Sequence, residues 1–502
     1  MKLGHWFKWQ PLMLIALLYG SMNGFGFSML GPWADWMNLS EGYKQPGDIG
    51  GPMNLGEGYR WNMPVVTYGF DRSFLDFFGT NGVAAVEAAI GILNASPPVS
   101  SLALSNYPVA AWGPNWTAVA LNLYDLKSVT LFLLLEQMGL TDPVRYDFCI
   151  RDYYRNPGST NYMFDVIERN FDPTTAQPSS YVNGESYTYE IQEYSFPPTS
   201  PTNEFCDAIP FVVDPSAPQN YPATTASALS PGYYLRGLSQ DDVGGLRYLL
   251  SGSQVYCESL LSDVQAVGTN TSSPVRTADR PGIEKVTFVR HPYGTLNGEF
   301  MPFTNIWTDV YYGWDSPAYQ DVERITTSPD ILFTGQDLGP GATVIRSGTT
   351  NWANNADLNG NSGGAGPGVI QPPITITFNT VGRFYVNGPY PFYADQLGAT
   401  VGYSWASFDG STNFPIVYPN VQIAFQPTQV HFRLLLGGMT NNFHWSLAGA
   451  AYALFYFQTV SNLTLNNWTT LATLTNSGEP FSYQFQAPTN DSIRFFRTIQ
   501  QP

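Results

Sequence analysis

Two carboxylates on either side of a glycine are the first residues in this chain that could do chemistry. Glu136 stands three residues before Gly139, and Asp142 stands three residues after it. A carboxylate near the end of a helix and another beyond a glycine bend could both bind one cation. Two carboxylates without a third ligand make a poor zinc site, however. The simpler interpretation is that Glu136 pairs with a nearby cation such as Arg145.

The spacing resembles the zinc-binding helix of metzincin proteases. That helix carries the pattern H-E-x-x-H-x-x-G-x-x-H, in which three histidines hold zinc and the glutamate activates a water molecule. The corresponding positions here are Phe132, Leu133, Glu136, Gly139 and Asp142. The glycine bend is retained, but the first histidine and the catalytic glutamate are replaced by apolar residues. The resemblance therefore implies a degenerate metzincin-like domain without zinc, a general base or catalytic residues.

Two further segments resemble the matrixin branch of the metzincins. Residues 65–71 (VVTYGFD) resemble the first strand of a matrixin catalytic domain, and residues 238–249 (LSQDDVGGLRYL) resemble its closing helix, L-S-x-D-D-I-x-G-I-x-x-L. After the strand, an amphipathic helix is predicted by apolar residues at three- and four-residue steps, namely Val83, Val86, Ile90 and Leu93. The resemblance covers about residues 60 to 252.

The closing-helix motif also has a local explanation. Ser239 can cap the helix, and Asp242 can return the hydrogen bond as in a capping box. Asp241 and Asp242 face the positive end of the helix dipole. We therefore expect all three residues to be structural. No histidine lies between His5 and His291, so the segment has none that could bind zinc.

The composition predicts a folded protein with several domains. A length of 502 residues suggests about three domains, at roughly 100 to 200 residues each. Hydrophobic residues make up 43% and charged residues 12%, which suits neither a disordered nor a membrane-embedded chain. The formal charge of −17 argues against a nucleic-acid partner, because phosphate binding needs a basic surface.

The beginning of the chain resembles an export signal. Lys2 and Lys8 form a basic region before an apolar run at residues 11–19. Gly24-Phe25-Gly26 then offers a small-x-small cleavage site. The run is too short to span a bilayer, and no later segment reaches about 18 apolar residues without charges. We expect a signal peptide over residues 1–26, no transmembrane segment in the mature chain, and a secreted or cell-surface location, extracellular or periplasmic.

Changes in composition and periodicity predict the remaining divisions. Alternating apolar residues at 286–288 and 374–378 indicate half-buried strands after residue 283. Short strands recur again after residue 430. The expected divisions are an extended lead-in over 27–60, a matrixin-like domain over 61–265 with a long insertion at 143–237, a linker over 266–282, a β-sandwich over 283–425, and a small β-sandwich over 426–502.

The last of these divisions resembles a known module. The segments TVSNLTLNNWTTL (459–471), GEPFSY (478–483) and RFFR (494–497) are similar to a C-terminal module like fibronectin type III, found at the ends of many secreted bacterial proteins. The expected fold class is thus multidomain, α+β and all-β. It consists of a metzincin-like α/β N-terminal domain followed by two β-sandwich domains.

Two smaller sites are also predicted. One disulfide is expected in an oxidising compartment, with Cys206 and Cys257 as the favoured pair and the other pairings of the three cysteines left open. Asp357, Asn359 and Asn361 have the oxygen spacing of a calcium loop, but the glycine and the glutamate that such a loop needs are absent. A plain turn is therefore the expected alternative to a calcium site, and no other cofactor is predicted.

These observations predict a non-catalytic protein. Its expected role is binding or structural, at the cell surface or in the extracellular matrix, with another copy of itself, a surface protein or a polysaccharide as partner. The Tyr-rich insertion, which contains Tyr153, Tyr154 and Tyr162, is the expected binding surface. An extracellular hydrolase, either a divergent metallopeptidase or a glycan-active enzyme, is the alternative left open.

Overall fold

The computed structural model describes residues 24–44, 48–155, 162–194, 205–216, 230–267, 273–294, 299–313, 316–336, 346–360, 366–380 and 404–419, together with short segments beyond residue 430. The chain divides into two compact units, residues 1–419 and residues 420–502. The described part is rich in strands, has few helices and contains many sheets, which fits an all-β or α+β fold.

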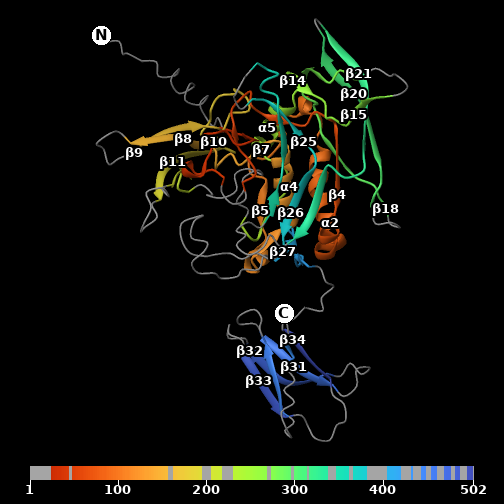
Figure 1. Ribbon diagram of the computed structural model, residues 1–502. Coiled ribbons are helices and arrows are strands. Elements are labelled where there is room, and N and C mark those ends of the chain that lie inside the picture. Colours follow the sequence, from red (N-terminus) through yellow and green to blue (C-terminus); the bar gives the residue numbers. More distant parts are fainter. Residues whose placement is uncertain are drawn as a thin grey trace, which may run out of the picture. The chain divides into compact units, whose positions relative to one another are not determined.

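The first unit is organised around a five-stranded sheet with the order β17-β4-β22-β26-β23 (Figure 1). The first four strands run parallel to one another, and β23 pairs antiparallel with β26 at the edge. The strands are β17 (Thr287–Arg290), β4 (Val65–Phe70), β22 (Ile331–Gln336), β26 (Ile374–Asn379) and β23 (Arg346–Gly348).

This sheet shows that the β-sandwich expected over residues 283–425 is not a separate domain. β17 and β22 lie on either side of β4, and Phe288 is in register with Val66. The segment therefore completes the sheet of the first unit. The alternation at residues 374–378 correctly indicated a strand, but alternation identifies only the two faces of a strand and not the strand beside it.

Helix α2 (Arg72–Ala95) packs on this sheet, and α4 (Leu126–Gln137) packs against α2. Asp71 caps α2 by accepting a 2.9 Å hydrogen bond from the Phe74 N–H. The predicted apolar face is confirmed, since Val83, Val86, Ile90 and Leu93 are all buried. Rings from several elements meet in this core, namely Phe74, Phe78, Phe333, Phe378 and Trp405.

Helix α2 is also the one described helix that is long and apolar enough to cross a membrane, judged by length and composition. Its buried residues belong to the core of the first unit. A core helix passes the same test, so this finding by itself assigns no membrane span.

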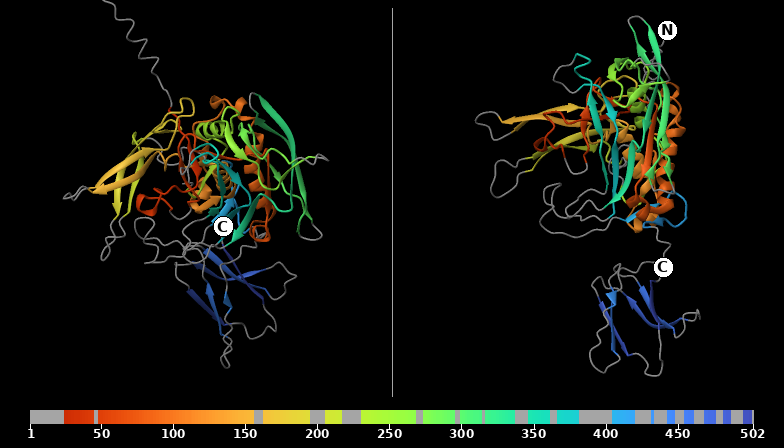
Figure 2. Two further views of the ribbon diagram at one scale, coloured as in Figure 1. Left: turned by 45° about the horizontal axis from the view of Figure 1, so that its top comes forward. Right: turned by 45° about the vertical axis from the view of Figure 1, so that its right-hand side comes forward.

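A second five-stranded sheet has the order β14-β16-β20-β21-β15. Its long hairpin, β20–β21, extends from the first unit on the side away from the β8–β9 ribbon (Figure 2). The strands are β14 (Tyr256–Ser259), β16 (Thr277–Arg280), β20 (Phe303–Tyr312), β21 (Pro317–Thr326), β15 (Val264–Ala266), β8 (Phe148–Arg155) and β9 (Tyr162–Glu168).

The linker expected over residues 266–282 is likewise corrected by this sheet. β16 pairs with both β14 and β20, and the Arg280 side chain at its end is buried. The polar composition of the segment suggested a linker. Of its charged residues, Arg276 and Asp279 are exposed, whereas Arg280 is buried and paired with Asp309.

The insertion at 143–237 forms strands of its own. The β8–β9 ribbon packs beside a three-stranded sheet with the order β10-β11-β12. Of the tyrosines expected to line a surface, Tyr154 is exposed, while Tyr153 and Tyr162 are half-buried and meet edge to face. The strands are β10 (Tyr181–Val182), β11 (Glu185–Tyr194) and β12 (Phe205–Val212).

The N-terminal lead-in is built into the first unit through β1 (Ser28–Gly31), which pairs with β2 (Gly51–Met53) and β7 (Leu140–Thr141). The fold begins before the expected cleavage site. The Gly24 carbonyl accepts a hydrogen bond from the Gly184 N–H, and the Phe25 carbonyl accepts one from Ser179. Residues 24–26 are therefore part of the described fold, and a cleavage after Gly26 would remove these contacts. Residues 1–23 lie outside the described part of the chain.

Short elements complete the first unit. The helices are α3 (Trp116–Ala120), α5 (Gln240–Leu250), and the 3-10 turns η1 (Leu39–Glu41), η2 (Val99–Ser101) and η3 (Leu104–Asn106). The strands are β3 (Tyr59–Arg60), β5 (Trp112–Pro114), β6 (Leu123–Asp125), β13 (Tyr233–Leu235), β18 (Tyr293–Gly294), β19 (Glu299–Phe300), β24 (Asn351–Asn354), β25 (Gly368–Gln371), β27 (Ser404–Ser407) and β28 (Ile416–Val417).

The second unit contains two three-stranded antiparallel sheets, with the orders β29-β30-β33 and β32-β31-β34. Phe457 in β31 is fully buried there, and Trp468 is half-buried. The strands are β29 (His431–Phe432), β30 (Asn442–Leu447), β31 (Leu454–Val460), β32 (Thr469–Thr475), β33 (Phe481–Gln486) and β34 (Phe495–Gln500).

Candidate functional site

The positions that correspond to a zinc site lie around the end of α4. Asp125 caps this helix, accepting a 3.0 Å hydrogen bond from the Ser128 N–H. Phe132 and Leu133, at 2% and 1% exposure, belong to the core. Neither carries a ligand atom or a titratable group, so the first metal ligand and the general base of a metzincin have no substitute here.

The three remaining positions are also accounted for locally. Gly139 has a φ of +94°, and a Cβ there would lie 2.2 Å from the Tyr59 carbonyl oxygen. Only glycine fits that bend. Glu136 is half-buried, and the Asp142 carboxylate accepts hydrogen bonds of 2.9 and 3.3 Å from the N–H groups of Val144 and Arg145. Asp142 thus fixes the turn after the helix.

Arg145, suggested as a partner for Glu136, forms an ion pair with Asp48. Among the described residues, no group of three or more His, Cys, Asp or Glu side chains is placed to hold a metal ion.

The capping box expected at the closing helix is present. Ser239 caps α5, and Asp242 Oδ2 accepts a 2.7 Å hydrogen bond from the Ser239 N–H. Asp241 points elsewhere, since its carboxylate accepts from the N–H groups of Gly26 and Asn183 at 3.0 and 2.5 Å. All three residues therefore have structural roles, as expected.

The expected disulfide is absent, because Cys206 and Cys257 are both free, as is Cys149. Cys206 lies in β12 of the insertion, while Cys257 lies in β14 of the second five-stranded sheet. These strands belong to different sheets, and spacing along the chain could not reveal that separation.

The segment weighed as a weak calcium loop against a plain turn makes contacts with the rest of the protein. Asn359 Oδ1 accepts a 2.9 Å hydrogen bond from the Cys257 N–H, so this oxygen is committed to the protein backbone. Asp357 is exposed, and Asn361 lies outside the described residues. The segment that the structure describes therefore behaves as a turn that binds β14.

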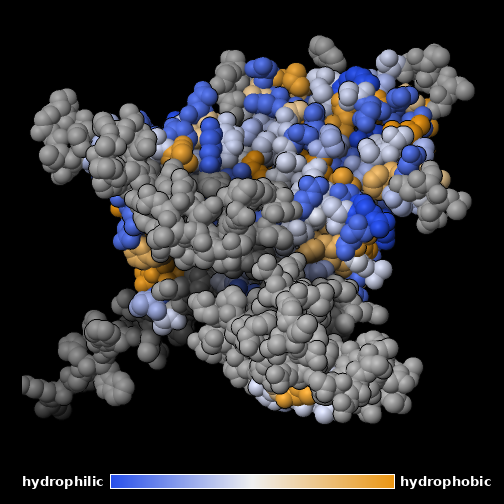
Figure 3. Space-filling view, turned by 60° about the horizontal axis from the view of Figure 1, so that its bottom comes forward, coloured by the Kyte–Doolittle hydropathy of each residue, from blue (hydrophilic) through white to orange (hydrophobic). Residues whose placement is uncertain are grey.

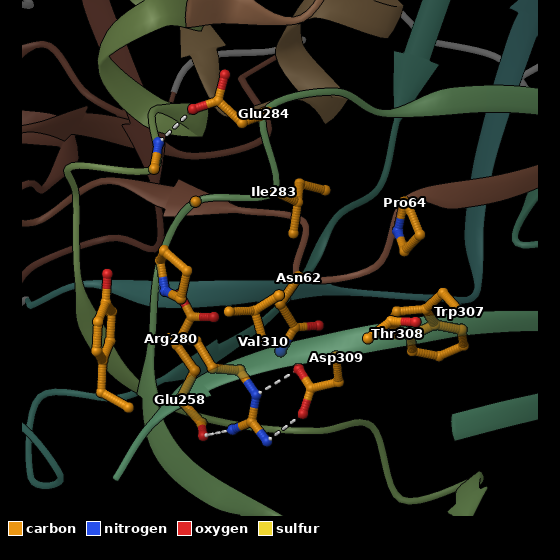
Figure 4. A pocket seen from close by; sticks show the side chains of 14 residues that line it. Asn62, Pro64, Glu258, Arg280, Ile283, Glu284, Trp307, Thr308, Asp309 and Val310 are labelled. Carbon is orange, nitrogen blue, oxygen red and sulfur yellow. Dashed lines mark hydrogen bonds and ion pairs between the residues drawn. The ribbon is translucent and has the colours of Figure 1, made fainter. Parts of the chain in front are cut away.

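A cavity of about 410 Å³ is the strongest candidate for a functional site (Figure 4). It lies where the chain between β3 and β4 meets the loop after β16 and the middle of β20. Gly282 allows this loop to pass close to the end of α5, because a Cβ there would lie 2.4 Å from the Leu250 carbonyl oxygen.

Buried ion pairs form the floor of the cavity. Arg280 binds Asp309 through two bonds of 2.9 and 3.0 Å, from Nε to Oδ1 and from Nη2 to Oδ2. Behind it, Arg60 Nε donates to Glu258 Oε1 at 2.8 Å, and Arg60 Nη2 donates to the Arg280 carbonyl at 3.1 Å. Four strands are joined in this way, and burial with a fixed partner holds each charge rigidly.

The walls carry apolar and amide groups. Figure 4 places Trp307 and Pro64 at one end of the cavity and Ile283 and Glu284 at its top, with the Asn62 amide near the centre. Asn62 Nδ2 donates to the Ser259 carbonyl at 3.0 Å, and this bond fixes the orientation of the amide. Rigid polar groups between apolar walls are typical of a small-molecule site.

Reasoning from sequence missed this cavity. Arg280 fell within the expected linker, and Asp309 lay in a segment assigned to a different domain. An arginine directly before Pro281 and Gly282 was the only local signal, and it does not indicate burial.

Comparison with known proteins gives no relative from which a role could be transferred. No family model matches the chain, and no curated protein or solved structure matches it.

Proposed function

We propose that this chain is an exported, non-catalytic binding protein of the cell surface or extracellular matrix, with a metzincin-like N-terminal part that has lost its metal. The observation that carries the proposal is the burial of Phe132 and Leu133 in the core of the first unit. A metallopeptidase needs imidazole ligands and a carboxylate base at these positions, open to water and substrate. Two apolar side chains packed in a core can supply neither.

The order of the local elements supports the metzincin-like part of this proposal. A strand at 65–70, a helix at 72–95, a helix at 126–137 that ends in a glycine bend, and a capped helix at 240–250 follow one another as expected from the resemblance. The remaining strands of the main sheet come later in the chain than the closing helix.

The cavity supports a binding role better than a flat patch does. On the face seen in Figure 3, hydrophobic and hydrophilic residues are interspersed over the described surface. Scattered apolar residues are ordinary on a protein surface. A cavity with a rigid polar floor is a more specific feature.

The alternative, an extracellular hydrolase, is kept as an outcome of the test. A glycan-active enzyme would need two carboxyl groups free to reach the substrate. In the cavity, Asp309 is bound by Arg280, and Glu284 accepts hydrogen bonds from the N–H groups of Ser100 and Gly252 at 2.9 and 2.7 Å. Glu258, the third carboxylate of the lining, is bound by Arg60 through Oε1, so all three carboxylates are held in structural contacts.

The test combines metal content, hydrolysis and binding on the purified full chain. We expect less than 0.1 zinc per chain by elemental analysis, taking roughly a tenth as background for a chain without a structural site. We also expect no cleavage of casein and no release of reducing sugar from soluble polysaccharides. Retention on envelopes of the parent cells or on insoluble polysaccharides would support the binding role. One zinc per chain together with chelator-sensitive proteolysis, or catalytic release of sugar, would refute the proposal.

A further inference from the structure

We infer that the cavity lined by Asn62, Arg280, Trp307 and Asp309 binds an uncharged saccharide, an inference that rests on the proposed binding function. The cavity volume of about 410 Å³ lies within the range of small-molecule sites, about 300 to 1,000 Å³. It thus has room for roughly one or two sugar rings. The ligand class follows from the charge and hydrogen-bonding state of the lining groups.

Among the described residues, the lining of the cavity offers no free cation to an anionic ligand. Arg280 is the one basic residue in the part of the lining that the structure describes. Besides its two hydrogen bonds to Asp309, the Arg280 guanidinium donates to three backbone carbonyls. These are the carbonyls of Glu258 at 2.6 Å, Arg276 at 3.0 Å and Val275 at 2.7 Å. A guanidinium has five N–H donors, and these contacts use all five. Phosphate, sulfate and uronate groups would therefore meet no available donor from Arg280.

Two of the three carboxylates that line the cavity, Asp309 and Glu258, are neutralised by arginines, and the third, Glu284, keeps its charge while each of its oxygens accepts a backbone N–H. Asp309 is bound by Arg280, and its Oδ2 accepts a third bond of 2.7 Å from the Gln320 amide. Glu258 forms its ion pair with Arg60. Glu284 accepts two backbone N–H groups, as described above. A cationic ligand would therefore compete with existing partners, whereas a neutral hydroxyl can bind the remaining lone pairs without breaking an ion pair.

The apolar walls and the amide match the two kinds of surface on a sugar ring. A pyranose presents C–H groups on its faces and hydroxyls at its edge, so it packs on an aromatic ring while bonding to amides and carboxylates. Trp307 and Pro64 provide an apolar end of the cavity, and the Asn62 amide lies between them and Arg280 (Figure 4). Because the ion pairs and Asn62 are already fixed, little conformational entropy is lost on binding.

Tyr312 offers a second aromatic contact to a ligand in the cavity. It lines the cavity and is 40% exposed. Tyr319, which is 65% exposed on the paired strand β21, does not line the cavity. The two tyrosines therefore form a matched pair of test and control positions on one hairpin.

Binding of soluble oligosaccharides to the full chain, measured by calorimetry, tests the inference. The probes are hexasaccharides of β-1,4-glucose, β-1,3-glucose, β-1,4-mannose and β-1,4-N-acetylglucosamine, with oligogalacturonate as the anionic probe and spermidine as the cationic one. We expect at least one neutral probe to bind, neither charged probe to bind, and affinity to stay within about twofold between 0.05 and 0.5 M NaCl, since no charge pairing is involved.

Variants localise the binding. Tyr312→Ala and Trp307→Phe should each lower the affinity for the neutral probe by roughly fivefold or more, while Tyr319→Ala should leave that affinity unchanged. Trp307→Phe keeps an apolar ring, so the chain should remain folded, which circular dichroism would verify. Binding of only a charged probe, no binding of any neutral probe, or equal affinity in all three variants would overturn the inference. Retention on cell envelopes that survives in these variants would leave the binding function standing and place it elsewhere.

Discussion

The Asp241 carboxylate accepts a hydrogen bond of 3.0 Å from the backbone N–H of Gly26, which lies 215 residues earlier in the chain. Its second oxygen accepts the Asn183 N–H, so one side chain in the closing helix holds both the N-terminal segment and the insertion. Burial raises the pKa of Asp241 well above its usual range. This aspartate is thus a structural junction between three distant segments.

Replacing Asp241 with Ala should destabilise the first unit. Two buried N–H groups would lose their acceptor, at about 1 to 3 kcal/mol each. Urea unfolding followed by fluorescence measures the change. Asp35→Ala, at an exposed aspartate, is the control and should leave the midpoint unchanged. Equal midpoints for the Asp241 variant and the native chain would show that the junction contributes nothing.

For a chain exported as proposed, we expect the N-terminus of the processed protein to lie at or before Gly24. Residues 24–26 bind Gly184, Ser179 and Asp241, and cleavage after Gly26 would remove all three contacts. Intact mass and N-terminal sequencing of exported protein give the cleavage site. A mature chain that starts at Phe27 and melts at the same temperature as one that starts at Gly24 would contradict this prediction.

Stability should fall as the pH rises from about 4 to about 8, because of Asp147. Both of its oxygens are buried without a hydrogen-bond partner, and burial, with a smaller effect from Glu168, raises its pKa to about 8. The unfolded carboxyl ionises near 4, so between these values the unfolded state binds fewer protons than the folded state, and raising the pH favours unfolding. Above about 8 both states are ionised and this contribution levels off.

The variant Asp147→Asn isolates this contribution, since an amide has a similar shape and no charge. The native chain and the variant should have similar melting temperatures at pH 4, and the variant should melt higher at pH 8 to 9. A difference that does not change with pH would show that Asp147 does not titrate as described.

The Arg280–Asp309 pair should contribute strongly to the stability of the second five-stranded sheet. Arg280→Met leaves Asp309 buried without its charged partner, and breaking one side of a buried pair costs about 3 to 5 kcal/mol. The exposed i,i+4 pair between Arg72 and Asp76 provides the control, because Arg72→Met should change little. Thermal unfolding of both variants compares the two sites. An equal loss of melting temperature in both variants would mean that burial of the Arg280–Asp309 pair does not determine its contribution to stability.

Phe457 should be a core residue of the second unit. It is fully buried in β31, and Phe→Ala at such a site costs about 3 to 5 kcal/mol, whereas Trp468→Ala at a half-buried position should cost less. Scanning calorimetry of the full chain should show two unfolding transitions. Phe457→Ala should lower the melting temperature of one transition and leave that of the other unchanged. A single transition that shifts as a whole would indicate that the two units unfold together.

Local signals in the sequence determined the helices and their ends. The three- and four-residue spacing from Val83 to Leu93 defined the buried face of α2, and Ser239 with Asp242 defined the start of α5. Gly139 was identified as a bend from its spacing after the helix, and its left-handed backbone favours glycine. Each of these signals acts over four residues or fewer, so it can be read from the chain alone.

Only the tertiary structure decided which distant segments lie together. β17 and β22 pair with β4 across more than 200 residues, Cys206 and Cys257 fall in different sheets, and Arg280 meets Asp309 beneath the cavity. An alternating pattern identifies the two faces of a strand but not the strand that pairs with it. A buried arginine must have a hydrogen-bond acceptor, but its position in the chain does not reveal which residue that is. Strand pairing and burial are settled by the packing of the whole unit, and the cavity exists only where that packing leaves space.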